Sequence, residues 1–287
     1  MIGEGRDSSN QKHHTHVRDG VKVGFFTDPT VCIGCKACEV ACKEWNDVPA
    51  DPLPLTGRSY DNTVALGASS WRHVLFLEEP LRSGTQITGP MGEGGEDPFR
   101  WQFLSDVCKH CEEAGCLEAC PTGSIVRTET GTVYVQDDVC NGCGYCVVTC
   151  PFGVIDRRDA TGVPGEGGAF KCTFCYDRQI SGLVPACAKA CPTESIRFGP
   201  LDDLAREAEH RLDELRRAGF GDARLYDPQE TSVRGTHATF LLLGPPETYN
   251  LPPRPDVPTI HLRAAYGSMI ATAVAAAAFV VGAFLWL

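Results

Sequence analysis

The chain has 287 residues, enough for one or two domains with their own hydrophobic cores. It carries 26 basic and 37 acidic residues, a formal net charge of −11, and no basic stripe stands out, which argues against nucleic-acid binding. Its 16 cysteines all lie between Cys32 and Cys191, and this clustering indicates cofactor sites rather than the cross-links of a small disulfide scaffold.

The N-terminal residues 1–20 are polar and have no apolar core, so they do not read as a secretory signal, and we interpret them as a mobile tail. His13, His14 and His16 could bind a metal, but nothing nearby in the sequence completes a site, and a solvated tail is the simpler interpretation. Without a signal, the protein either stays inside the cell or crosses a membrane already folded, together with a partner that carries the signal.

The first of four cysteine runs follows a short apolar segment, residues 21–26, which predicts a strand. Its spacing is C-x2-C-x2-C-x3-C, that of the bacterial ferredoxin run whose thiolates hold a [4Fe–4S] cluster. The run consists of Cys32, Cys35, Cys38 and Cys42. Lys43 stands where the ferredoxin pattern has Pro, which predicts a helical turn beyond the run, with Trp45 as an apolar cover or a core residue.

The second run follows residues 48–100, in which Pro- and Gly-rich loops flank one predicted strand at 73–77. The Gly-rich stretch 89–95 has the wrong spacing for a dinucleotide-binding loop, so we interpret it as a surface loop. The run, spaced x2, x4 and x3, consists of Cys108, Cys111, Cys116 and Cys120. His110 lies within it; because four cysteines complete the set, we interpret His110 as a residue beside the site or on the surface.

A predicted hairpin leads into the third run, with strands at 124–127 and 132–135 and a turn at 130–131. The third run has the full ferredoxin spacing, C-x2-C-x2-C-x3-C-P. It consists of Cys140, Cys143, Cys146 and Cys150, followed by Pro151. We expect a short strand at 151–155 and a Gly-rich loop at 159–168 after it.

The fourth run has an insertion, with spacing x2, x11 and x3, and it is readable as a ferredoxin loop because three complete runs precede it. It consists of Cys172, Cys175, Cys187 and Cys191. Disulfides would need an oxidising compartment and separations that x2 loops rarely give, and zinc favours two well-separated C-x2-C pairs. Four [4Fe–4S] clusters fit both the number of cysteines and the repeat. Ferredoxins exchange the fourth cysteine between paired runs, but the spacing does not say which runs pair.

Three segments follow the cysteine runs. Residues 201–218 have apolar residues at helical spacing opposite a charged face, which predicts a packing helix or one that docks a partner. Residues 239–243 predict a buried strand. Six prolines within 245–258 predict a stiff, extended linker.

The C-terminal residues 264–287 contain no charged residue and no His. A helix of this length crosses the hydrocarbon core of a bilayer, which is about 30 Å thick, so we predict a transmembrane anchor. Its many small residues would let a membrane partner approach closely, and Tyr266 and Trp286 suit the two interfaces. Arg254 and Arg263 flank its N-terminal side, and the positive-inside rule alone would place the globular part in the cytoplasm.

Five motifs give the chain a resemblance to a known family. They are CEVACKEWN (38–46), SDVCKHC (105–111), CNGCGYC (140–146), KCTFCYDR (171–178) and ACAKACPT (186–193). From about residue 23 to its C-terminal span, the chain resembles the iron–sulfur (beta) subunit of membrane-bound formate dehydrogenase, a four-cluster ferredoxin-like electron-transfer subunit of the molybdopterin oxidoreductase group. The electron-transfer subunits of many molybdopterin enzymes and hydrogenases share the layout of four cysteine runs. Within that group, residues 43–46 after the first run and the C-terminal span favour the formate dehydrogenase subunit.

The resemblance implies an α+β fold with two ferredoxin-like dicluster units, one nested in the other, plus a C-terminal transmembrane helix. The outer unit would comprise residues 21–103 and 168–245, the inner unit 104–167, the Pro-rich linker 246–262 and the anchor 263–287. In that family the first run pairs with the fourth and the second with the third. The implied ligands are Cys32, Cys35, Cys38 and Cys191 for cluster 1; Cys42, Cys172, Cys175 and Cys187 for cluster 2; Cys108, Cys111, Cys116 and Cys150 for cluster 3; and Cys120, Cys140, Cys143 and Cys146 for cluster 4.

No substrate chemistry is expected of the chain itself, because it has no P-loop, nucleophile elbow or zinc-protease helix. The resemblance implies that four [4Fe–4S] clusters carry electrons from a molybdenum or tungsten bis-pterin subunit that oxidises formate to a membrane subunit that carries haem b or reduces quinone. The resemblance also favours a globular part on the extracytoplasmic side of the cell membrane, whereas the positive-inside rule would place it in the cytoplasm. The nearest alternative is the equivalent subunit of a membrane hydrogenase or of a sulfur-compound or sulfoxide reductase, and a zinc-bound scaffold is a remote one.

Four lysines lie next to or near ligand cysteines in the sequence. They are Lys36, Lys109, Lys171 and Lys189. Our hypothesis is that they raise cluster reduction potentials by offsetting negative charge, and the alternative is that they are ordinary surface lysines.

Overall fold

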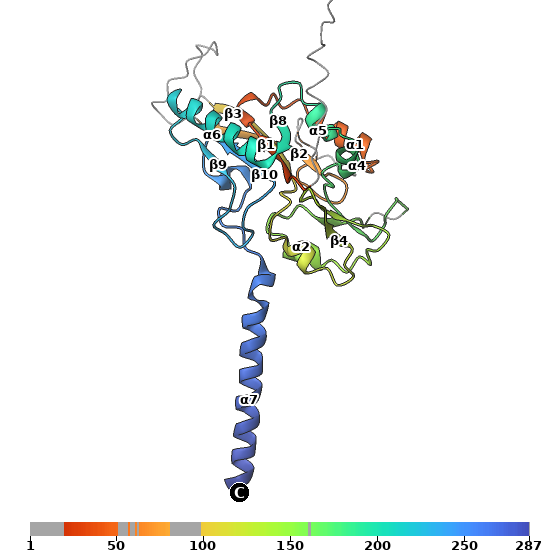
Figure 1. Cartoon of the computed structure of the whole chain (residues 1–287), viewed down its shortest axis with the longest axis vertical. Helices are drawn as coiled ribbons and strands as arrows, with labels where there is room; N and C mark the ends of the chain where they lie inside the picture. Colours follow the sequence, from red (N-terminus) through yellow and green to blue (C-terminus); the bar gives the residue numbers. More distant parts are fainter. Residues whose placement is uncertain are drawn as a thin grey trace, which may run out of the picture.

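The computed structural model describes residues 20–50, 57, 61, 63–80, 99–159 and 162–286. The tail with His13, His14 and His16 and the Gly-rich stretch 89–95 lie outside the described residues. The described part consists of a head, in which all the cysteine runs lie, and one long helix that leads away from it (Figure 1).

The central sheet of the head has four strands in the order β8-β1-β10-β9. The inner pair, β1 and β10, is parallel, and each edge strand is antiparallel to its neighbour. The strands are β1 (Val23–Thr27), β8 (Ile196–Pro200), β9 (Arg224–Tyr226) and β10 (Ala238–Leu242). The sheet therefore joins a segment before the first cysteine run to segments after the last one, and the strands predicted at 21–26 and 239–243 are confirmed.

The predicted amphipathic helix is confirmed as α6 (Leu201–Arg217), which covers one face of this sheet. Its buried residues Leu204, Ala208 and Leu215 pack against Phe26 of β1 and a leucine of β10. The opposite face of β1 presents Phe25 toward the cysteine-bearing half of the head. All five residues of β1 are buried because both faces of the sheet are covered.

A second, two-stranded sheet consists of β2 (Arg72–Pro80) and β3 (Phe99–Val107) in antiparallel register. The strand predicted at 73–77 is confirmed and is longer than expected. β3 was not predicted, because residues 48–100 were interpreted as loops around a single strand. The two strands bring buried residues such as Val74 and Leu104 under the first cysteine run.

The predicted hairpin is confirmed as β4 (Ile125–Arg127) paired with β5 (Val133–Val135). The strand predicted at 151–155 is wrong: residues 151 and 152 form a turn, and the next strand, β6 (Asp156–Arg157), starts later and pairs with β7 (Ala169–Phe170). Two features prevent pairing there. Pro151 has no N–H to donate, and Gly153 has a φ of +61°.

Five short helices carry or follow the cysteine runs. They are α1 (Ala37–Trp45), α2 (Gly115–Glu118), α3 (Tyr145–Thr149), α4 (Tyr176–Ile180) and α5 (Ala186–Lys189). Figure 1 shows α1, α4 and α5 together at one end of the head and α2 beside β4 near the base of the long helix.

The Pro-rich segment differs from the extended linker that its composition predicts. Its first residues form the 3-10 turn η3 (Pro246–Tyr249), and Tyr249, Leu251 and Val257 are buried. These apolar side chains lie between the prolines and attach the segment to the head. The segment ends in a second 3-10 turn, η4 (Pro258–His261), whose Thr259 side chain hydrogen-bonds to Glu118 of α2.

The chain continues directly into α7 (Leu262–Trp286), which extends away from the head (Figure 1). Among the described residues this is the one helix, over Pro258–Leu285, that is long and apolar enough to cross a membrane, and its apolar window packs against nothing else in the chain. Phe279, Phe284 and Leu285 are each about four-fifths exposed. A solvent-exposed helix of this composition is consistent with a membrane anchor.

Candidate iron–sulfur sites

Three internal cavities are each lined by four cysteines. Set 1 is Cys32, Cys35, Cys38 and Cys191; set 3 is Cys108, Cys111, Cys116 and Cys150; set 4 is Cys120, Cys140, Cys143 and Cys146. In each set three cysteines come from one run and the fourth comes from another run, as the ferredoxin exchange requires.

The remaining four cysteines form set 2: Cys42, Cys172, Cys175 and Cys187. All four are buried, between 5% and 7% exposed. The Cys42 thiol lies close enough to the other three for their charges to act on it. The structure therefore brings together the same four groups of cysteines that the family resemblance implies.

Left-handed backbone residues precede three of the helices in the runs, α1, α3 and α4, and bend the chain there. Lys36 before α1, Gly144 before α3 and Cys175 before α4 have φ values of +59°, +77° and +48°. Each turns the preceding loop back so that its sulfurs face inward. Within α1, Cys38 and Cys42 lie one turn apart on the same face, yet they belong to sets 1 and 2. The helix thus places two neighbouring sets side by side.

Burial raises the pKa of eight of these thiols. It brings those of Cys38 and Cys116 to about 12, so both sulfurs are neutral near pH 7 unless a cation replaces the proton. Cys120 shifts the other way: burial raises its pKa, but hydrogen bonds from the Ser124 and Thr122 hydroxyls and from the Ile125 and Thr122 amides outweigh burial and lower it to about 7. Iron binding would ionise the buried thiols, which couples metal loading to the folding of these loops.

The surroundings of the thiols fit a polynuclear cluster. N–H groups donate to the sulfurs: Phe174 N to Cys172 at 3.3 Å, and Ala169 N to Cys140 at 3.4 Å. The described His, Cys, Asp and Glu side chains include no group of three placed to hold a single metal ion. Four thiols around a cavity, with amide donors to the sulfurs, are the environment that a [4Fe–4S] cluster requires.

Comparison with known proteins identifies the family. Residues 31–124 and 99–201 each match a model of a 4Fe-4S dicluster domain. The chain is 40% identical over 241 residues to the formate dehydrogenase iron-sulfur subunit of Haemophilus influenzae, covering 83% of this chain and 70% of that one. It is 39% identical over 240 residues to the formate dehydrogenase-O iron-sulfur subunit of Escherichia coli, covering 82% and 73%.

The chain belongs to the formate dehydrogenase iron–sulfur subunits. Two dicluster domains and 16 cysteines give this member of the family four [4Fe–4S] clusters. More distant relatives are also electron-transfer subunits of oxidoreductases. One subunit of the anaerobic dimethyl sulfoxide reductase of Escherichia coli is 32% identical over 184 residues, which cover 64% of this chain and 76% of that subunit.

His110, which sequence analysis placed beside a site, is buried in this iron–sulfur subunit and lines the set 3 cavity. Its Nδ1 accepts a hydrogen bond from Val133 N at 3.1 Å, which leaves the proton of the neutral ring on Nε2. The ring packs against Phe174. Trp45 is 46% exposed and donates its indole N–H to Asp177, so it covers the surface near α4 and is not a core residue.

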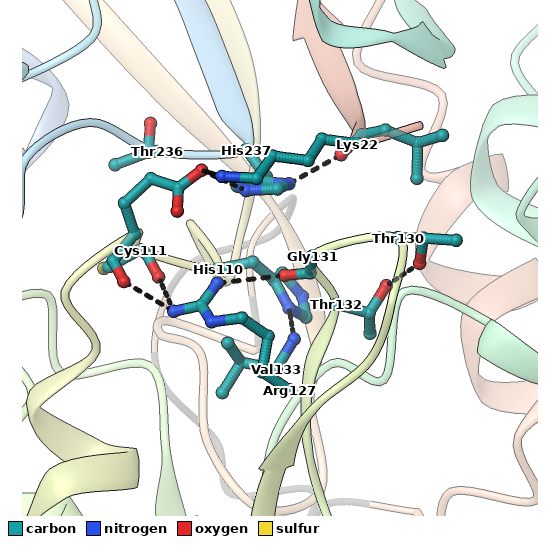
Figure 2. Close-up of polar contacts among 12 residues, drawn as sticks. Lys22, His110, Cys111, Arg127, Thr130, Gly131, Thr132, Val133, Thr236 and His237 are labelled. Carbon is teal, nitrogen blue, oxygen red and sulfur yellow. Dashed lines mark hydrogen bonds and ion pairs between the residues drawn. The ribbon is translucent and has the colours of Figure 1, made fainter. Parts of the chain in front are cut away.

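A polar network behind Cys111 joins the central sheet to the β4–β5 hairpin (Figure 2). His237, fully buried before β10, lies 2.7 Å from the carbonyl oxygen of Val23 and 3.1 Å from a carboxylate oxygen of Glu112. Lys22 pairs with the same carboxylate at 2.5 Å. Arg127 of β4 donates to the backbone carbonyls of Cys111 and Glu112, both at 2.6 Å. Sequence reasoning missed this network because its members lie as many as 214 positions apart.

Sequence reasoning also missed Arg72, the first residue of β2. Its side chain is fully buried, and Nη2 lies 3.3 Å from the Cys187 sulfur in set 2. The four lysines of the sequence hypothesis differ from one another. Lys36 pairs with Glu39 and Asp61, and Lys109 pairs with Asp106. Lys171 instead contacts a thiol, that of Cys108, at 3.4 Å. For Lys189, no thiol contact is found among the described residues.

Proposed function

We propose that this subunit conducts electrons from a formate-oxidising molybdenum or tungsten bis-pterin subunit, through its four [4Fe–4S] clusters, to a membrane subunit that carries haem b or reduces quinone. The observation that carries the proposal is the grouping of all 16 cysteines into four sets of four within a formate dehydrogenase family member. When bound, each cluster takes up and releases one electron. The chain's own residues fix the positions of the clusters and exclude water around them.

The proposed ligands are the four sets as defined above, so each cluster is held by three cysteines of one run and a fourth from its paired run. Two ferredoxin-like units follow from this pairing, the inner one (104–167) nested within the outer one (21–103 and 168–245). The central sheet supports the nesting, because its strands come from before the first run and after the last. In that arrangement the segments 246–262 and 263–287 connect and anchor the head.

Shared elements support a single row in the order 1, 2, 3, 4. Sets 1 and 2 share α1, which carries Cys38 and Cys42. Set 3 adjoins set 2 through Lys171, which contacts Cys108 and is followed by Cys172. Sets 3 and 4 meet at α3, which contains Cys146 of set 4 and is followed directly by Cys150 of set 3. The two exposed cysteines, Cys35 and Cys143, belong to the terminal sets 1 and 4, where partners would receive or deliver electrons.

The inner unit is the part of the head next to the anchor. Val257 lies beside Gly115 at the start of α2, where an added Cβ would come within 3.0 Å of its side chain, and Thr259 hydrogen-bonds to Glu118. Figure 1 shows α2 near the base of α7. Electrons would therefore leave from the inner unit toward the bilayer and the cytochrome subunit. We assign the head to the extracytoplasmic side of the cell membrane, on the family resemblance and against the charge rule.

A second candidate function has support from the comparisons. The thiosulfate reductase electron transfer subunit of Salmonella typhi is 35% identical over 215 residues, which cover 93% of its length. Such a subunit would use the same row of clusters in front of a different catalytic chain. We favour formate because the relatives named for it are more similar, at 38% to 40% identity, over more of the chain.

The test is reduction by formate in the intact complex. The complex is extracted anaerobically in mild detergent, and its EPR spectrum is recorded before and after formate is added. We expect formate to produce reduced [4Fe–4S] signals from this subunit, with dithionite as the positive control for cluster content. Clusters that dithionite reduces and thiosulfate re-oxidises, but that formate does not reduce, would assign the chain to the second candidate function.

A further inference from the structure

Arg72 and Lys171 are two buried cations that lie among the cysteine sets without a carboxylate partner in the described part of the chain. Each is 2% exposed. Burying an unpaired cation is costly, and buried charges in proteins are normally paired. The neighbouring lysines follow that rule, since Lys36 and Lys109 pair with carboxylates. Arg72 and Lys171 instead face sulfur.

Arg72 lies between sets 1 and 2. Its Nη2 is 3.3 Å from the Cys187 sulfur of set 2. Its Nη1 donates to the backbone and side-chain oxygens of Ser105, both at 3.2 Å, and the same Ser105 hydroxyl lies 3.3 Å from the Cys38 sulfur of set 1. The guanidinium packs over the Phe25 ring at 4.7 Å, which holds it away from water.

Lys171 lies between sets 2 and 3. Its ammonium contacts the Cys108 sulfur of set 3 at 3.4 Å and the carbonyl oxygen of Cys172, a set 2 cysteine, at 3.3 Å. A third contact, to the carbonyl oxygen of Val133, fixes the ammonium in place. Set 2 therefore has a buried cation on each side, whereas sets 1 and 3 each adjoin one of the two.

Two effects on the reduction potential oppose each other at set 2. Burial of its four thiols disfavours the extra negative charge of the reduced cluster. Positive charge and N–H donors near the sulfurs favour it. Besides Arg72, set 2 has the Phe174 amide on Cys172 and the Asn46 side chain within 3.9 Å of Cys42 and Cys175, so each of its four sulfurs has a nitrogen donor close by. A full charge in a low-dielectric core is weakly screened, and we expect it to outweigh the loss of solvent.

We propose that Arg72 and Lys171 act together as the counter-charges of the cluster in set 2 and make it the position of highest reduction potential in the row. An electron would then rest at set 2 in the partly reduced enzyme. The inference rests on the proposed ligand sets. It makes Arg72 and Lys171 positioning residues for electron transfer. Arg72 lies in none of the cysteine runs, so their pattern does not indicate it.

The test is an EPR redox titration of the anaerobically purified complex, poised with dithionite and mediator dyes so that it does not depend on formate as substrate. In Arg72→Gln, we expect the cluster with the highest potential to become harder to reduce. Its equilibrium constant for one-electron reduction should fall on the order of a hundredfold, which equals about 120 mV. Lys171→Gln should shift the same EPR component in the same direction, because only set 2 adjoins both cations, and it should also lower the potential of the set 3 cluster, whose Cys108 sulfur Lys171 contacts.

Arg158→Gln is the matched control. Arg158 is also a buried arginine packed on a phenylalanine ring, but it donates to the carbonyl oxygens of Ala68 and Pro164 and contacts no thiol. Its substitution should leave all four potentials in place. Arg72→Lys, which keeps the charge, should retain most of the native potential.

The outcomes separate the proposal from the assignment of function. Unshifted potentials in Arg72→Gln with full iron content would overturn the proposal, as would a Lys171→Gln variant in which the component of highest potential does not move. If Arg72→Gln loses iron, Arg72→Lys decides: native iron with a near-native potential supports the role of charge, and loss of iron in both shows that Arg72 is needed only for folding. A complex that formate does not reduce would refute the proposed function and leave this titration interpretable.

Discussion

Gly131 lies at the turn of the β4–β5 hairpin. We expect that adding one methyl group there separates the hairpin from the central sheet. The φ of Gly131 is +85°, and a Cβ there would overlap the imidazole ring of His237. His237 is fully buried and is hydrogen-bonded to Val23 and Glu112, so its displacement would break both bonds. Gly131→Ala should therefore break the polar network that joins the hairpin to the central sheet.

The magnitude follows from two contributions. An alanine in the left-handed region costs about 1–2 kcal/mol. Displacing His237 loses its two hydrogen bonds, one of them to a carboxylate, which adds about 2–3 kcal/mol. The matched control is Gly123→Ala, because Gly123 has a φ of +67° but open space around its Cβ position. That variant should show the backbone cost alone.

Hydrogen–deuterium exchange of the reduced, iron-loaded complex measures the difference locally. We expect exchange in residues 125–135 to accelerate about tenfold in Gly123→Ala and several hundredfold in Gly131→Ala, since each 1.4 kcal/mol is a factor of ten. Residues 201–217 of α6, which lie on the far face of the sheet, should be unaffected by either change. Equal acceleration in the two variants would refute the role assigned to His237.

Three further predictions concern ligands and the anchor. Cys191→Ser should remove one cluster, with iron falling from about 16 to about 12 per chain, and the lost EPR component should differ from that lost in Cys120→Ser, because the two cysteines belong to sets 1 and 4. Gly142→Ala should reduce the occupancy of set 4 selectively, because its Cβ would overlap the carbonyl of Gly167, and EPR integration measures that loss. Deletion of 262–287 should move the subunit to the soluble fraction with its iron retained, since none of the apolar window of α7 is buried against the described residues; a truncated subunit that stays with membranes would show that another surface anchors it.

Local patterns predicted the parts of the structure that depend on local chemistry. The helical spacing of apolar residues predicted α6, and two strand-like segments on either side of a Thr-Gly turn predicted the β4–β5 hairpin. The cysteine runs were readable because a cluster requires thiols at close spacing within one loop. The grouping into sets needed the family resemblance, because the fourth cysteine of each set lies in a distant run.

Long-range chemistry was not predictable from the sequence. Arg72 and Cys187 are 115 positions apart, and nothing around Arg72 distinguishes it from a surface arginine at the start of a strand. The Pro-rich segment looked like a linker because composition does not reveal that Tyr249 and Leu251 are buried in the head. The strand expected at 151–155 failed because a local apolar run was given more weight than Pro151 and Gly153, which end pairing.

The most direct measurement of the central claim is iron and acid-labile sulfide analysis combined with EPR on the anaerobically purified complex. We predict about 16 iron atoms and about 16 sulfides per chain, as four [4Fe–4S] clusters of which formate reduces at least one. A preparation with native folding but with zinc in place of iron, or with clusters that no reductant can reduce, would contradict the account.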